Sequence, residues 1–134
     1  YLDKQLLGNT MFHDAIPLII GLLTKHMVAD YYTQYSWMMR GKGTYGAFGG
    51  LAHSGWHGIL TLAVLNFLGI NFWWALLMGL LDSVVHYHID YVKTNIWKSR
   101  DYTPEDHAYW MIHGTDQFLH LMTYVLILHL TFPF

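Results

Sequence analysis

The chain has 134 residues, of which 54% are hydrophobic and 12% are charged, with a formal net charge of −2. A soluble domain typically has about 25% charged residues, so this composition indicates a surface that faces lipid rather than water. The small negative charge gives no basic footprint for nucleic acid, and the lack of cysteine excludes disulfides and thiolate metal ligands. The length suits a single domain over residues 1–134.

The first half of the chain predicts two membrane-spanning helices separated by a glycine-rich loop. The first apolar segment runs from about 15 to 35, with Asp14 as its expected N-cap, and is long enough to cross a bilayer. Residues 36–50 include five glycines and are expected to form a flexible loop. The second apolar segment covers about 51–68.

The second half predicts two more helices. The third span, about 72–91, follows directly after Gly69-Ile70-Asn71, so it should pair with the second as an antiparallel hairpin capped by Asn71. A polar segment over 93–106 then leads to the fourth span, about 110–132. The predicted fold class is all-α, an integral membrane bundle of about four transmembrane helices. A soluble helical bundle with an unusually apolar core is the alternative.

Basic residues indicate how such a bundle would be oriented. The 36–50 and 93–106 connections carry lysine and arginine, whereas the joint between the second and third helices carries neither. Cytoplasmic loops are enriched in these residues, so both basic loops are expected in the cytoplasm, and the predicted location is a bacterial inner membrane.

Histidine and aspartate recur at four-residue spacing on all four predicted helices. Residues four apart share one face of a helix, so each helix should present a polar stripe to the bundle interior. The hairpin topology places all the stripes in the same half of the bundle. The residues of these stripes are His26, Asp30, His53, His57, Asp82, His86, Asp90, Asp116 and His120.

This combination of imidazoles and carboxylates suits a divalent metal such as zinc, iron or manganese, and helical bundles often hold metals between facing helices. The number of candidates exceeds one tetrahedral shell, so one or two ions are expected. Asp90 is assigned as a ligand or general base, and Lys93 as an electrostatic aid to catalysis. The predicted metal ligands are His26, Asp30, His53, His57, Asp82, His86, Asp116 and His120.

Four short motifs resemble, in order, those of a bacterial and phage family of small membrane proteins known as domain of unknown function 3307. They are LLTKHMVADYYTQYSWM, LAHSGWHGILT, LLDSVVHYHIDYVK and TDQFLHL. The resemblance implies no established activity. More distantly, the arrangement is similar to predicted membrane-bound metal-dependent hydrolases, which place His and Asp pairs on transmembrane helices.

The leading hypothesis is a metal-dependent membrane hydrolase that acts on a lipid or lipid-linked substrate at the cytoplasmic membrane face. Membrane lipids are its expected partners, and a homo-oligomer or a larger membrane complex is compatible with the small residues on its helices. One alternative is an oxidative di-iron enzyme, since His53 and His57 match a two-histidine element of that class. The other is a non-enzymatic structural or accessory subunit, in which the stripes join helices or, less favourably, ligate haem.

Overall fold

The computed structural model describes residues 2–132, with the side chains of residues 14–132, and it is all-helical over that part of the chain. The elements are α1 (Leu2–Met27), the π-helical turn η1 (Val28–Tyr32), α2 (Ser36–Gly41), α3 (Phe48–Phe67), α4 (Phe72–Arg100) and α5 (His107–Thr131). The all-α prediction is therefore confirmed.

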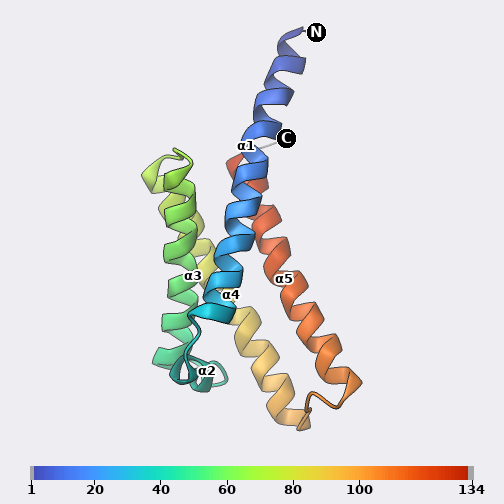
Figure 1. Ribbon diagram of the computed structural model, residues 1–134. Coiled ribbons are helices and arrows are strands. Elements are labelled where there is room, and N and C mark those ends of the chain that lie inside the picture. Colours follow the sequence, from blue (N-terminus) through green and yellow to red (C-terminus); the bar gives the residue numbers. More distant parts are fainter. Residues whose placement is uncertain (1, 133–134) are drawn as a thin grey trace.

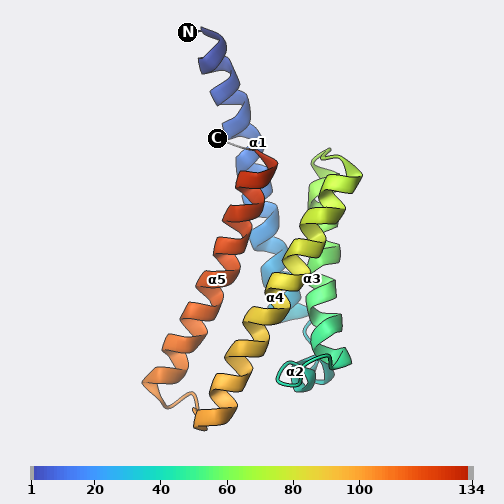
Figure 2. The same ribbon diagram turned by 180° about the vertical axis from the view of Figure 1, so that it is seen from behind.

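The four long helices form one bundle (Figures 1 and 2). Helices α3 and α4 form an antiparallel hairpin, and α1 and α5 each pack against one of its members and against each other. The α2 segment and the α4–α5 connection lie at one end of the bundle, and the α3–α4 turn lies at the other (Figure 1). The N-terminal part of α1 extends beyond the other helices.

The α3–α4 turn follows the prediction from its sequence. Gly69 adopts a φ of 79°, which glycine accommodates without strain, and the Ile70 N–H donates to the Leu65 carbonyl at 3.0 Å. Asn71 then caps α4, because its Oδ1 accepts hydrogen bonds from the backbone N–H groups of Trp73 and Trp74. The end of α3 and the start of α4 are thus both capped within residues 68–71, and these two caps fix the geometry of the hairpin.

Several predicted boundaries were wrong. The first helix begins at Leu2, so Asp14 lies inside it and is no cap, and helical structure stops at Tyr32 rather than at residue 35. Helix α4 continues to Arg100 through a segment predicted as loop, because residues 92–100 contain neither glycine nor proline.

The bundle interior has an apolar half and a polar half. Residues of the apolar core lie toward the α3–α4 turn: Leu18, Leu22, Leu65, Ala75, Met78, Tyr124 and Ile127. Toward α2, the buried side chains are mainly histidines, aspartates and lysines. Between these halves α3 and α4 approach each other so closely that a Cβ added at Gly58 of α3 would be 2.5 Å from the Gly79 carbonyl oxygen of α4.

The expectation of four transmembrane spans is not supported. Over the part of the chain that the structure describes, none of the helices combines the length with the mean apolar character that crossing a bilayer requires. The buried polar side chains explain the difference, because each lowers the mean hydropathy of its helix although it faces the interior.

Candidate metal centre

Four potential ligands converge in the polar half of the bundle. One atom from each of Asp30, His53, His57 and His86 lies within 4.8 Å of the others. Oδ1 of Asp30 is 3.1 Å from Nε2 of His53, 3.1 Å from Nε2 of His57 and 3.9 Å from Nε2 of His86. The Nε2 atoms of His53 and His86 are 3.1 Å apart. We call these four residues the first ligand group.

The separations in the first ligand group match a metal coordination shell. Ligand atoms about 2.1 Å from a tetrahedral ion lie about 3.4 Å from one another, and the four separations given above, 3.1 to 3.9 Å, bracket this length. Two imidazole lone pairs cannot face each other at 3.1 Å without a proton or a cation between them. The contact between His53 and His86 is therefore one that a bound cation would stabilise.

The hairpin supplies three of these ligands through simple helix geometry. His53 and His57 are one turn apart on α3, and His86 faces them from α4. The imidazoles of His57 and His86 stack with centroids 3.6 Å apart. All three side chains are at most 1% exposed.

Asp30 reaches the group from the π-helical turn η1. The wider turn is closed by the Thr33 N–H, which donates to the Val28 carbonyl at 3.0 Å. A π turn inserts an extra residue into helical geometry and so changes which face the following side chains occupy, and such turns are frequent at functional sites. The sequence predicted a regular helix here, and no glycine or proline marks the departure.

A second group lies beside the first and shares a ligand with it. His86, Asp90 and His120 each place one atom within 4.8 Å of the other two. The carboxylate of Asp90 is 3.4 Å from Nε2 of His86 and 3.7 Å from Nε2 of His120. Because one imidazole nitrogen has one lone pair, Nε2 of His86 can serve a cation in only one of the two groups at a time.

The second group also contains an unsatisfied buried atom. Among the side chains of residues 14–132, Nε2 of His120 has no partner at hydrogen-bonding geometry, although the residue is 1% exposed. Buried polar atoms are nearly always paired, by protein, water or an ion. The groups nearest to this nitrogen are two carboxylates, Asp116 Oδ1 at 3.5 Å and Asp90 Oδ1 at 3.7 Å.

Protonation in the first ligand group favours a cation. Burial lowers the pKa of His57 to about 3, against the opposing effect of Asp30, and burial lowers the pKa of His86 well below its usual value. Burial alone would raise the pKa of Asp30, but the imidazoles of His53 and His57 lower it further than burial raises it. At neutral pH His57 and His86 are uncharged and Asp30 is ionised, which is the state that binds a divalent metal.

His120 differs from these histidines. Burial would lower its pKa, but the neighbouring carboxylates of Asp116 and Asp90 raise it to about 8. His120 is therefore protonated at neutral pH when no cation is bound, and it must release that proton before it can act as a ligand.

Three predicted ligands lie outside both groups. His26 borders the first group, 3.3 Å from Asp30, but its ring nitrogens contact the Tyr124 hydroxyl at 2.8 Å and Gln117 Oε1 at 3.0 Å. Asp82 pairs with Lys25 and accepts a hydrogen bond from the Thr61 hydroxyl. The remaining one, Asp116, accepts a hydrogen bond from Lys93 at 2.7 Å.

The lysines set the electrostatics around the two groups. Lys93 bridges two carboxylates, since its Nζ is also 3.5 Å from Asp90. Lys42, from the connection after α2, places its Nζ 2.6 Å from the same Asp90 carboxylate. Lys25 contacts Nδ1 of His57 at 3.3 Å. For Nε2 of His57 to bind a metal, Nδ1 must carry the proton, so the Lys25 ammonium would turn fully to its other partner, Asp82.

Lys25 and Lys42 were missed as site residues. Lys25 had a signal in the sequence, because a lysine within an apolar helical segment must find a buried partner. Lys42 had none. It reaches the site because the backbones of Gly41 and Gly49 approach closely, which brings the end of α2 onto α3.

A cavity of about 310 Å³, which we call the polar cavity because charged and amide side chains line it beside aromatic rings, gives access to Asp30 of the first ligand group. Asp30 forms part of its wall, together with Lys42 and Lys93. The remaining lining combines amides and aromatic rings: Gln34, Gln117, His113, Tyr31, Trp97 and Tyr109 among others. Water or a polar part of a substrate can therefore reach Asp30 without unfolding the bundle.

Comparison with known proteins gives a family and no described activity. No curated protein and no solved structure matches the chain. A family described as protein of unknown function (DUF3307) matches residues 18–134, a stretch that includes both ligand groups. Because this match covers most of its length, the chain belongs to the DUF3307 family.

Proposed function

We propose that the protein binds one divalent metal ion in the first ligand group and uses it to hydrolyse an ester. The observation that carries the proposal is the convergence of Asp30, His53, His57 and His86, from three separate elements, at the separations of a coordination shell. Three imidazoles and one carboxylate suit zinc, iron or manganese.

A hydrolytic role is supported by the groups next to the metal position. A divalent cation in this group would lower the pKa of a water molecule and polarise an oxygen of the substrate. Asp90, whose carboxylate lies 3.4 Å from Nε2 of His86 beside the metal position, is the group that we assign to take a proton from water. Lys42 and Lys93 are placed to stabilise negative charge that develops on the substrate.

A membrane is the proposed location, with lipids as partners of the outer surface. Large apolar side chains are exposed on every long helix, among them Ile20 on α1, Phe67 on α3, Leu80 on α4 and Phe118 on α5. An apolar surface of this extent marks an interaction site. The basic residues Arg40, Lys98 and Arg100 are exposed at the end that carries α2, which favours the anionic cytoplasmic face.

A di-iron oxidative enzyme is the second candidate, and the second ligand group is the observation that favours it. His86, Asp90 and His120 lie beside the first group, so a carboxylate could bridge two ions if each took different ligands. Iron at two equivalents with a visible absorption band would support this candidate over the hydrolase.

Elemental analysis of the purified full-length chain tests the proposal. One equivalent of zinc, iron or manganese is expected, and His57→Ala should lose it. His88→Ala is the matched control, because His88 is exposed and lies off the face that carries His86. Metal-free protein after incubation with each of these ions, or equal metal in both variants, would overturn the metal site and favour a structural role for the polar stripes.

A further inference from the structure

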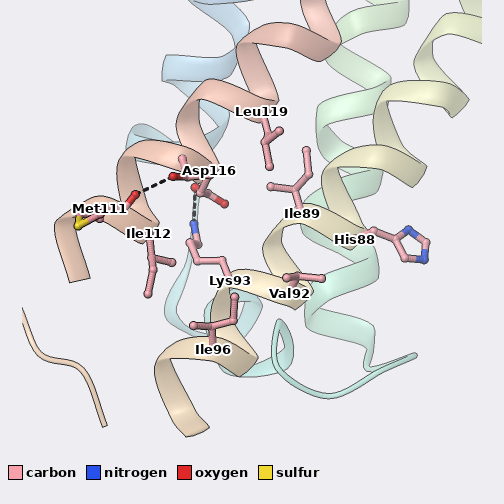
Figure 3. Close-up of a pocket in the computed structure, with 10 residues that line it drawn as sticks. His88, Ile89, Val92, Lys93, Ile96, Met111, Ile112, Asp116 and Leu119 are labelled. Carbon is pink, nitrogen blue, oxygen red and sulfur yellow. Dashed lines mark hydrogen bonds and ion pairs between the residues drawn. The ribbon is translucent and has the colours of Figure 1, made fainter. Parts of the chain in front are cut away.

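An apolar groove of about 480 Å³ runs between α4 and α5, on the side of the bundle next to the second ligand group. Figure 3 shows its walls, which are formed by Ile89, Val92, Ile96, Met111, Ile112 and Leu119. Val92 is 53% exposed and Met111 is 60% exposed, so the walls are open to a ligand. The volume lies within the range of small-molecule sites, about 300–1,000 Å³.

The groove meets the metal centre at one side chain. Lys93 lines the groove and also lines the polar cavity that contains Asp30. In Figure 3, Lys93 and Asp116 face each other across the space between α4 and α5. The Lys93 ammonium is 3.5 Å from Asp90, which belongs to the second ligand group. A molecule that fills the groove therefore has its end within reach of the proposed catalytic groups.

We propose that the groove holds the single apolar chain of an amphiphilic phosphate monoester, with its phosphate in the polar cavity beside Lys93 and Lys42. The apolar walls favour a hydrocarbon chain, and an anionic head would exchange with the carboxylates of Asp90 and Asp116 as the partner of the two lysines. This assignment names the substrate class of the proposed hydrolase and rests on that function. In the reaction the water gives a proton to Asp90 as its oxygen bonds to phosphorus, the ester P–O bond breaks, and the departing alkoxide takes that proton, giving an alcohol and inorganic phosphate.

Two probes with the same head separate the contribution of the chain from that of the phosphate. The full-length protein, loaded with metal and held in amphipathic polymer, is titrated with monodecyl phosphate and with methyl phosphate, and phosphate release is followed for both. Decyl phosphate should bind at least about tenfold more tightly, because only its chain gains apolar contact. Lys93→Gln should weaken the binding of both probes.

A bulky side chain in the groove tests where the chain lies. Val92→Trp should remove most of the preference for decyl phosphate, whereas Val125→Trp, at a 46% exposed position of α5 outside the groove, should retain it. Met111→Trp repeats the test from the opposite wall. Metal content is measured in every sample, so that altered folding or loss of the ion is recognised.

The outcomes distinguish the two proposals. Protein without metal refutes the proposed function itself. If the metal-loaded protein binds or cleaves methyl phosphate and decyl phosphate equally well, the proposed metal function stands and the proposed role of the groove is refuted. The role of the groove is also refuted if the metal-loaded variants Val92→Trp, Met111→Trp and Val125→Trp all show the same preference for decyl phosphate over methyl phosphate.

Discussion

Replacing Gly58 by alanine should force α3 and α4 apart and weaken the metal centre. The added Cβ would lie 2.5 Å from the Gly79 carbonyl oxygen, where ordinary contact begins at 3.4 Å, so the helices would separate by up to about 0.9 Å. Overpacking of this kind typically costs about 1–3 kcal/mol, and the rigid backbone oxygen places this site toward the upper end. Alanine recovers about 1 kcal/mol of helix propensity, which leaves a net loss near 2 kcal/mol.

Gly55→Ala is the matched control, because among the described residues nothing lies within 4 Å of a Cβ at that position. It should raise the free energy of unfolding by about 1 kcal/mol, and Gly58→Ala should lower it by about 2 kcal/mol. At roughly 4 °C per kcal/mol, thermal unfolding of the metal-free proteins should differ between the variants by about 12 °C. Widening the 3.1 Å contact between His53 and His86 should also weaken metal binding in Gly58→Ala. A Gly58→Ala protein as stable as wild type, with unchanged metal affinity, would refute the close approach of the two helices.

Four further predictions concern the polar half of the bundle. Asp30→Asn preserves the shape of the ligand but removes its charge, so elemental analysis should find metal occupancy reduced about tenfold or more, and full occupancy would exclude Asp30 as a ligand. Lys25→Met leaves the Asp82 carboxylate buried without its cation and should cost about 3–5 kcal/mol in denaturant unfolding, whereas Lys25→Met with Asp82→Leu should recover much of the loss. In the metal-free protein, the folded-state pKa of His57 near 3 lies below the ordinary 6.5, so stability should fall as pH decreases from about 6.5 toward 3. For His120, the folded-state pKa near 8 lies above the ordinary 6.5, so its stabilising contribution is complete below pH 6.5 and is lost as pH rises through 8. Unfolding midpoints measured between about pH 6.5 and 9 should show this loss in the wild type and not in His120→Gln.

Local rules account for the parts of the fold that the sequence predicted well. Gly69 and Asn71 end one helix and begin the next by backbone and side-chain capping, which involves only neighbouring residues. The four-residue spacing of His53 with His57 placed both side chains on one face of α3, where the structure has them. Periodicity and hairpin topology were therefore sufficient to predict that His53, His57 and His86 gather in one half of the bundle.

Contacts between residues far apart in the chain determine the features that the sequence did not predict. Asp82 has the same spacing from His86 as Asp90 has, yet Asp82 pairs with Lys25 of a different helix and lies outside both ligand groups, whereas Asp90 lies in one. The π-helical turn that positions Asp30 contains neither glycine nor proline, so nothing in its residues distinguishes it from a regular helix. The transmembrane prediction relied on overall composition and on the length of the apolar segments, whereas the buried histidines, aspartates and lysines leave none of the described helices apolar enough on average to cross a bilayer.

The short turn between α3 and α4 also has a consequence for the order of folding. A hairpin closed by four residues forms early, because little chain entropy is lost in bringing its helices together. That hairpin already contains His53, His57, His86 and Asp90, whereas Asp30 and His120 arrive on the flanking helices. A metal ion captured by the hairpin would therefore act as a nucleus onto which the first and last helices dock, and the speed of refolding would depend on metal concentration.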